Sequence, residues 1–404
     1  MSLRVAIVVH GRFHGFDLAR ALLEAGVETQ VFTNYPRRVA ARFGLPPERV
    51  TGCVWHGVAS RLLQRCPRSR GAPMPLEAWV HRAFSRWAAG RVRSEDYDVV
   101  HCFSGIAEEL WQRLGAGGPL RSLVRGSAHI ETQHAILAEE ERLTGVSLEK
   151  PSPWMRAREI REYALCDQIT VLSRFAKDSF IERGVAEEKL VLVPLGSELV
   201  RFRATGETLA ARKARIRAGE PLRVLTVGTW SLQKGVPYLI QTARALGPLA
   251  RCRFVGGIAQ DARHLLREAR TVMEFRPRVP QHELPGQYAW GDVFLFPTLQ
   301  DGFAVVLAQA QAAGLPLLAT PNCAAPELVS EGRTGWIRPI RDAAGYAEQL
   351  RWCAAHREQL AAMVDAVGAS HAPRDWRTVA QEFVAVAMRG IDRKSPRKGA
   401  GKLR

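Results

Sequence analysis

The feature that most constrains this chain is a pattern of strand, glycine loop and helix that occurs twice, once at its start and again after residue 220. Arg4–Val9 is an apolar run of strand length, and a loop with Gly11 and Gly15 leads from it into a helix with one apolar face. Leu222–Val227 begins the second copy, which leads into a helix over Val236–Leu246. Strands that alternate with helices in this way form parallel βαβ units. The sequence therefore predicts two units of one kind.

Further apolar runs of strand length follow in both halves. In the first half they are Val27–Thr33, Tyr97–Cys102, Leu120–Val124, Asp167–Leu172 and Lys189–Val193. In the second half they are Arg253–Val255, Val272–Phe275, Val293–Pro297, Pro316–Ala319 and Gly335–Arg338. Helices are expected between them, notably over Gly302–Ala313 and Ala343–Val367. The predicted fold class is α/β, with two Rossmann-like doubly wound domains facing a cleft, where ligands bind at the carboxyl ends of the strands.

The expected domain organisation follows the break between the two copies. Residues 201–220 are charged and lack a strand pattern, so we expect a linker there, between a domain over 1–200 and a domain over 221–375. A closing helix is expected over 376–388, followed by a basic tail over 389–404. The length of 404 residues suits two domains of about 200 residues each.

The net charge of +17 is concentrated in two stretches. Residues 61–93 carry a net charge of +7 and residues 389–404 carry +6, so the rest of the chain is nearly neutral. Basic stretches of this kind bind phosphate-rich surfaces, either anionic lipid or nucleic acid, or they are simply solvated surface. No nucleic-acid-binding motif accompanies them, which argues against nucleic acid as the partner.

The first basic stretch also holds a segment with helical spacing. Trp79, Phe84 and Trp87 fall on one side of it and arginines on the other. Such a helix suits an anionic membrane surface, whereas the alternative is an ordinary helix that packs its aromatic residues on the first domain. No apolar run approaches the ~20 residues that cross a bilayer. Seven scattered cysteines indicate free thiols in a reducing compartment, so we expect a cytoplasmic protein, peripheral on the inner face of the membrane.

The window Phe296–Pro316 carries the first group of chemically informative residues. A strand ends, a polar loop carries Asp301 and Gly302, and a helix follows. Unpaired backbone N–H groups at a helix start favour an anion, so a phosphate is the expected ligand. Gln309 lies about 12 Å further along the helix, which suits the other end of an extended ligand. The alternative is that Asp301 only caps the helix and Gln309 lies on the surface.

A second window, 227–235, directly follows the first strand of the second copy. It contains Gly228, Thr229 and then Lys234, whose charge at the start of the next helix suits a phosphate. The G-x-x-x-x-G-K-[ST] pattern of a Walker motif is absent. The alternative is a solvated lysine at a helix start.

Together these windows resemble the retaining glycosyltransferases of family 4, which have the two-domain GT-B fold. The family motif E-G-F-G-x-x-x-x-E-A-x-A-x-G-x-P corresponds to D-G-F-A-V-V-L-A-Q-A-Q-A-A-G-L-P here, so its two glutamates are replaced. The segments YALCDQITVLS and KLVLVPLG, and the lysine–glycine pair at Lys234, also resemble family motifs. The resemblance covers most of residues 165–340 and, more weakly, the first 30.

The resemblance implies that the first domain (1–200) binds the acceptor and that the second (221–375) binds the nucleotide-sugar. It also implies a role for each matching residue. Lys234 would hold the donor diphosphate and Gln309 the ribose, while Asp301 would face the donor sugar as a catalytic residue. His129 is the second catalytic candidate, at a position where the family carries a histidine beside the donor sugar. The alternatives are that hydrogen bonds to neighbouring backbone satisfy His129, and that Arg125 or Ser127 contacts the donor sugar instead. The remaining donor-binding candidates are Gly11, Gly15, Arg125, Ser127, Gly228, Thr229, Gly302, Phe303 and Ala304.

The expected function also follows from the resemblance. It is a retaining glycosyltransferase, independent of metals and other cofactors, that moves a sugar from a nucleotide-diphospho-sugar to a glycan or lipid-linked acceptor in cell-envelope polysaccharide synthesis. Asp301 and Gln309 in place of glutamates, and Thr229 in place of an arginine, depart from the family pattern. The alternatives are therefore a catalytically silent relative that binds sugar nucleotides or glycans, and a nucleic-acid-binding protein.

Overall fold

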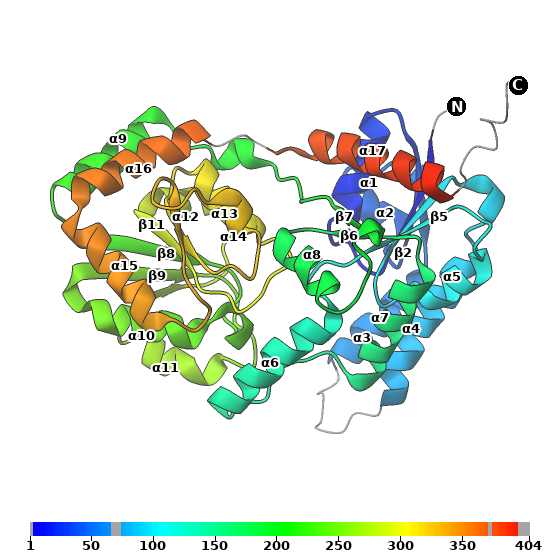
Figure 1. Ribbon diagram of the computed structural model, residues 1–404, viewed down its shortest axis with the longest axis horizontal. Helices are drawn as coiled ribbons and strands as arrows, with labels where there is room; N and C mark the ends of the chain where they lie inside the picture. The colour runs from blue at the N-terminus through cyan, green and yellow to red at the C-terminus, as the bar shows by residue number, and fades with distance from the viewer. Residues whose placement is uncertain (1–2, 66–73, 371–373, 395–404) are drawn as a thin grey trace, which may run out of the picture.

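The structure is a computed structural model that describes residues 3–65, 74–370 and 374–394. Figure 1 shows two α/β halves side by side, each built around a parallel sheet with helices packed against it. The prediction of two Rossmann-like doubly wound sheets is confirmed.

The first half holds a seven-stranded parallel sheet in the order β3-β2-β1-β4-β5-β6-β7. Its strands are β1 (Arg4–Val9), β2 (Glu28–Thr33), β3 (Val50–Gly52), β4 (Val99–Phe103), β5 (Leu120–Val124), β6 (Gln168–Val171) and β7 (Leu190–Leu192). Its helices are α1 (Gly15–Glu24), α2 (Arg37–Ala41), α3 (Val54–Arg65), α4 (Met74–Ala89), α5 (Glu108–Leu114), α6 (Ile130–Thr144), α7 (Pro153–Leu165) and α8 (Arg174–Ile181). The sequence did not predict β3, because three residues are too few to show a period.

The second half holds a six-stranded parallel sheet in the order β10-β9-β8-β11-β12-β13. Its strands are β8 (Leu222–Val227), β9 (Ala250–Val255), β10 (Glu274–Arg276), β11 (Val293–Phe296), β12 (Leu317–Ala319) and β13 (Gly335–Ile337). Its helices are α9 (Gly206–Arg217), α10 (Val236–Leu246), α11 (Leu266–Ala269), α12 (Leu284–Trp290), α13 (Val305–Ala312), α14 (Ala325–Leu328), α15 (Ala343–Ala355) and α16 (Arg357–Ser370). The prediction of a single helix over 343–367 is wrong, because the structure has two helices there. His356 leaves the helical conformation, and its Nδ1 lies 2.9 Å from the carbonyl oxygen of Trp352.

Helix α9 lies inside the segment predicted as a linker. Its Arg212 is fully buried and donates to the carbonyl oxygens of Gly291 at 2.7 Å, Ala313 at 2.6 Å and Gly314 at 2.9 Å. These carbonyls follow the ends of α12 and α13, so the guanidinium satisfies backbone acceptors that the helices leave unpaired. The segment is therefore part of the packing of the second half.

The last helix, α17 (Trp376–Lys394), returns to the first half, where it packs against α1 and β5 (Figure 1). It extends past the predicted end at Met388, so residues 389–394 of the predicted basic tail are helical. Lys394 Nζ lies 2.7 Å from Asp167 Oδ2, and Arg393 donates to the carbonyl oxygen of Glu188 at 3.0 Å. The rest of the tail, 395–404, lies outside the described residues.

The two halves touch at defined points. Buried Glu140 of α6 accepts from Arg341 Nε at 2.8 Å and from the Tyr238 hydroxyl at 3.1 Å, both from the second half. Ser127 Oγ donates to Gln300 Oε1 at 2.6 Å on the other side of the same junction. These contacts join the two halves.

Candidate active site

A cleft of about 560 Å³ lies between the halves, at the carboxyl ends of strands from both sheets. The topology places it where doubly wound sheets bind ligands. Of the residues predicted from the sequence, those that line it are Arg125, Gly228, Thr229, Lys234, Asp301, Phe303 and Ala304. The predicted residues outside the lining are Gly11, Gly15, Ser127, His129, Gly302 and Gln309.

The second-half wall is organised by an ion pair between Lys234 and Asp301. Lys234 follows β8 and Asp301 follows β11, and these strands are neighbours, so their carboxyl ends bring the two side chains together. Gly235, at φ +71°, lets the chain after Lys234 pass the carbonyl oxygen of Pro297, which would lie 2.0 Å from an added Cβ. The cation is thus held at the cleft surface by local packing.

Asp301 is both a capping residue and the partner of Lys234, and its contact with the donor sugar stays a prediction. Its Oδ2 pairs with Lys234, while its Oδ1 accepts from the backbone N–H groups of Phe303 at 3.2 Å and Ala304 at 3.1 Å. Helix α13 begins at Val305 rather than at Gly302, because Ala304 is left-handed at φ +64°. The carboxylate therefore caps the loop before α13 and also holds the lysine.

Gly302 lies at the junction between the halves. A Cβ at this position would lie 2.0 Å from the carbonyl oxygen of Gly126, which belongs to the first half. The glycine thus allows a close contact with the opposite half, and Gly302 is not among the residues that line the cleft. Its contact with a phosphate stays a prediction.

Gln309 lies inside the second half. Its side chain is buried, and its Oε1 accepts a hydrogen bond from the Tyr288 hydroxyl of α12 at 2.9 Å. The surface position considered for it is wrong. The structure does not bring it to the cleft lining, so the ribose contact stays a prediction without geometric support.

His129 lies behind the cleft. Its Nδ1 accepts from the Glu131 N–H at 3.2 Å as the cap of α6, and its ring packs between Tyr163 and Phe180. Burial lowers the pKa of His129 to about 4, so the ring is neutral. This is the arrangement of a histidine satisfied by neighbouring backbone, and it differs from the predicted contact with a donor sugar.

Arg125 does line the cleft, but its charge is already paired. Its Nε lies 2.8 Å from Glu159 Oε2, and its Nη2 donates to Gln133 Oε1 at 2.6 Å. Ser127 faces the junction through Gln300 instead of the cleft. Arg125 therefore lines the first-half wall with its charge paired to Glu159, and its contact with the donor stays a prediction.

The glycine loop after β1 reaches the cleft through its other side chains. Gly11 donates its N–H to Asn34 Oδ1 at 2.9 Å, and Gly15 starts α1 against Phe103. Their neighbours His10, Phe13 and His14 line the cleft together with His81 of α4. Sequence reasoning missed these four. The position directly after β1 was a signal for the first three, whereas only tertiary packing brings His81 there.

No group of three or more His, Cys, Asp and Glu side chains is arranged to hold a metal ion in the described parts of the chain. The polar groups that line the cleft include one ion pair on each side, three imidazoles and the hydroxyls of Ser104 and Thr229.

The chain matches two family models. The one described as Glycosyltransferase Family 4 matches residues 13–201, and the one described as Glycosyl transferases group 1 matches residues 221–356. D-inositol 3-phosphate glycosyltransferase of Pseudarthrobacter chlorophenolicus is 27% identical over 356 residues, which cover 82% of this chain and 79% of that protein. The putative colanic acid biosynthesis glycosyltransferase WcaL of Salmonella typhimurium is 30% identical over 180 residues, which cover 41% of this chain and 42% of that protein.

Solved structures share the fold. Sucrose-phosphate synthase from Thermosynechococcus elongatus has a TM-score of 0.69 at 17% identity, with 96% of this chain and 98% of that chain covered. Anabaena HepE in complex with UDP and glucose has a TM-score of 0.63 at 15% identity, with 96% and 99% covered. These neighbours show that the fold is of the GT-B type, and the two family models make the chain a glycosyltransferase. The chain belongs to glycosyltransferase family 4, with a group 1 second half.

Proposed function

We propose that this glycosyltransferase moves a sugar, with retention of configuration, from a nucleotide-diphospho-sugar to a glycan or lipid-linked acceptor in cell-envelope polysaccharide synthesis. The observation that carries the proposal is Lys234 at the carboxyl end of β8, beside the start of α13 and inside the cleft. The relatives support it, because HepE is described in complex with UDP and with UDP-glucose and WcaL is named for colanic acid biosynthesis.

The second half would stabilise the leaving diphosphate. Lys234 supplies a positive charge, and the N-terminus of α13 supplies the positive end of a helix dipole. Asp301 holds the lysine until the diphosphate takes over part of that contact. Neither a metal ion nor another cofactor is needed for this step, because these groups meet the negative charge that develops on the leaving oxygen.

Retention places the acceptor on the same face of the sugar as the leaving group. In that geometry an oxygen of the leaving phosphate takes the proton of the acceptor hydroxyl as the new glycosidic bond forms and the donor bond breaks. The protein then needs no strong base at the sugar.

Two measurements test this function. A thermal-shift panel of UDP, GDP and their sugars identifies the donor, because selective binding stabilises the folded chain by mass action. Proton NMR of the transfer product, with and without a chelator, then reports the configuration of the new bond and any need for a metal. Nucleotide binding without any product across lipid and glycan acceptors would identify a silent relative instead.

A second surface supports a position at the membrane, where lipid-linked acceptors are found. Val54, Trp55, Val58 and Leu62 form an exposed apolar stripe on α3, and Trp79 of α4 lies beside Trp55, with ring centroids 6.2 Å apart. In the part of the chain that the structure describes, no helix is long and apolar enough to span a bilayer. We propose peripheral attachment to the inner face of the cell membrane through this stripe and its flanking arginines, in a cytoplasmic protein.

The structure corrects which aromatic residues of α4 can face lipid. Phe84 is fully buried and Trp87 packs against it and against Phe32, so only Trp79 of the three predicted aromatic residues is exposed. Most of the apolar face comes from α3, which the sequence did not single out. Anionic lipid remains the proposed partner of the basic stretch 61–93 and of the tail, parts of which lie outside the described residues.

A further inference from the structure

Helix α6 begins in the first half of the molecule and reaches the second half (Figure 1). At its start, Ile130 is buried in the core of the first half, and Glu131 Oε1 accepts from Arg156 Nε of α7 at 2.8 Å. The backbone N–H of His129, which caps the helix, donates to Ser179 Oγ of α8 at 2.8 Å. The first turn of α6 is therefore fixed to the first half.

The later part of α6 packs on the second half instead. Leu137, and Leu148 just after the helix, are buried in the core of the second half, which also holds Leu232. The helix lies against the turn Leu232–Lys234, so it contacts the segment that brings Lys234 to the cleft. One helix thus joins the first half to the turn that carries the lysine of the opposite wall.

A buried carboxylate fastens this contact. Glu140 is fully buried, and it accepts from Arg341 Nε at 2.8 Å and from the Tyr238 hydroxyl at 3.1 Å. Arg341 also donates from Nη2 to the carbonyl oxygen of Ile136 at 3.2 Å and pairs with Glu139 at 2.9 Å. Its φ of +66° is one that residues other than glycine rarely adopt, so the contacts around it hold it there. All of these bonds cross from α6 to the second half.

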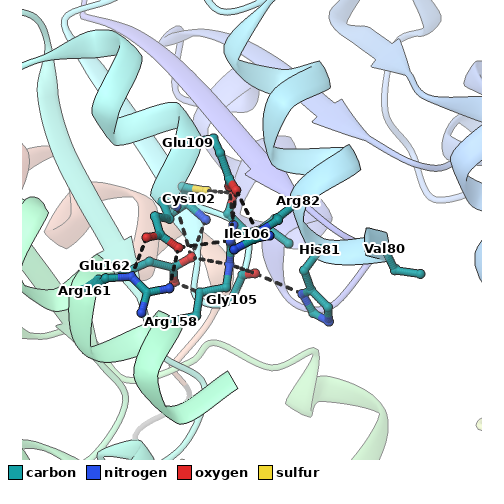
Figure 2. A network of polar contacts seen from close by, with 12 residues as sticks. Val80, His81, Arg82, Cys102, Gly105, Ile106, Glu109, Arg158, Arg161 and Glu162 are labelled. Atoms are coloured by element: carbon teal, nitrogen blue, oxygen red, sulfur yellow. Dashed lines mark hydrogen bonds and ion pairs between the residues drawn. The ribbon is translucent and has the colours of Figure 1, made fainter. Parts of the chain in front are cut away.

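The helix that follows α6 is fixed inside the first half by a buried network of charges (Figure 2). Arg158 of α7 is fully buried, donates to Glu109 Oε2 at 2.5 Å and pairs with Glu162 at 3.3 Å. Glu162 also accepts from the backbone N–H of Gly105 at 2.6 Å. These four residues all belong to the first half, so α7 anchors the chain after α6 there.

The chain is thus tied to the first half both at the start of α6 and after it. A movement that separates the halves leaves α6 with the first half and breaks the contacts of Leu137, Glu140 and Leu148 with the second. Such a movement also returns apolar surface to water, which favours the joined arrangement.

We propose that α6 is a latch between the halves, fastened by Glu140, Arg341 and Tyr238, and that release of this latch opens the cleft. Glu140 is then a positioning residue, because it holds α6 on the Lys234 turn and is not itself among the residues that line the cleft. The latch follows from the contacts of α6 alone, whereas its effect on nucleotide exchange rests on the proposed transferase function.

The variant Arg341→Gly tests the latch, because glycine keeps the left-handed backbone and removes the guanidinium. Glu140 then lacks its cation in the joined arrangement and is hydrated in the separated one, so the ratio of separated to joined forms should rise about tenfold or more. Small-angle X-ray scattering of the full chain without nucleotide should show a larger radius of gyration. Hydroxyl-radical footprinting should label Leu137 and Leu148 faster. Unchanged scattering and labelling would overturn the proposal.

Further variants separate release of the latch from loss of folding. Arg341→Gly/Glu140→Gln buries no unpaired charge, so its radius of gyration should return toward that of the wild-type protein. Tyr238→Phe removes one hydrogen bond to Glu140 and keeps the ring, so it should shift the same ratio in the same direction by about 2- to 10-fold. Arg156→Ala is the matched control, because Arg156 pairs with Glu131 of the same helix inside the first half. An equal expansion in this control, or no recovery in the double variant, would refute the latch.

Nucleotide release tests the effect of the latch on the cleft. UDP, or GDP if the thermal-shift panel selects it, should leave Arg341→Gly about 3- to 10-fold faster than the wild-type protein in stopped-flow displacement. Normal binding with an unchanged release rate would refute the positioning role of Glu140. Absence of nucleotide binding by the wild-type protein would refute the proposed donor site itself, while the scattering data would still decide the latch.

Discussion

Replacing Lys234 by alanine should weaken nucleoside diphosphate binding strongly. The Lys234 and Asp301 side chains are 19% and 24% exposed, so a phosphate that joins them meets a partly desolvated cation. A charge-assisted hydrogen bond in such a setting contributes about 1.5–3 kcal/mol. We therefore expect the Kd for UDP to rise about 10- to 150-fold in Lys234→Ala.

The charge of Asp301 adds a second expectation for this variant. Without the lysine, its carboxylate stays beside the diphosphate as an unpaired negative charge, which adds repulsion to the lost attraction. The double variant Lys234→Ala/Asp301→Asn should accordingly bind UDP more tightly than Lys234→Ala alone. A double variant that binds no better would show that Asp301 does not face the diphosphate.

Isothermal titration calorimetry with UDP measures these affinities. Lys213→Ala is a matched control, because Lys213 forms a 2.7 Å ion pair with Asp365 in the same half, and neither residue lines the cleft. An unchanged Kd in Lys234→Ala, or an equal loss in Lys213→Ala, would refute the placement of the diphosphate at Lys234.

Three further predictions follow from the described contacts. Asp301→Asn should lower kcat more than it raises the KM for the donor, because the asparagine oxygen still caps the N–H of Phe303. Steady-state kinetics measures both constants. A raised donor KM with a normal kcat would show that Asp301 is a binding residue only. The double variant Trp55→Ser/Trp79→Ser should sediment less with anionic liposomes than the wild-type protein does, because both indoles are exposed. The loss should persist in high salt, which screens the arginine contacts. Equal binding to neutral and anionic vesicles would exclude charge-assisted docking. Burial lowers the pKa of His101 to about 3, so the unfolded chain binds one more proton than the folded chain as pH falls below about 6.5. Stability should thus be lost toward acid, and at pH 5 His101→Asn should recover about 2 kcal/mol of that loss in urea titrations; an identical acid slope in both proteins would show that His101 titrates normally.

The sequence predicted the sheets well because parallel strands buried on both faces appear as uninterrupted apolar runs. Lys234 and Asp301, which the sequence assigned to one donor site, lie side by side for a related reason. Each follows the carboxyl end of a strand, and β8 and β11 are neighbours in the sheet. Position along the chain and topology were sufficient there.

Side-chain direction was harder to predict. His129 and Gln309 occupy the positions that the family resemblance indicated, but a cap on α6 and a bond to Tyr288 turn both away from the cleft. His81 comes from a helix in the basic stretch, where no local signal marks it, and it reaches the cleft only because α4 packs beside the loop at Gly105. Such contacts depend on tertiary packing, which a period or a motif does not encode.

The return of α17 to the first half has a consequence for biosynthesis. Its buried residues Val379, Phe383 and Val386 pack on elements made at the beginning of translation, and Gly390 fits so closely that an added Cβ would lie 2.6 Å from Gln168 Oε1. The second half is contiguous over 206–370, so all of it leaves the ribosome before α17 does. The half that is synthesised first is therefore the last to be completed, and a nascent chain truncated before residue 376 would expose the apolar surface of α1 and β5 to chaperones.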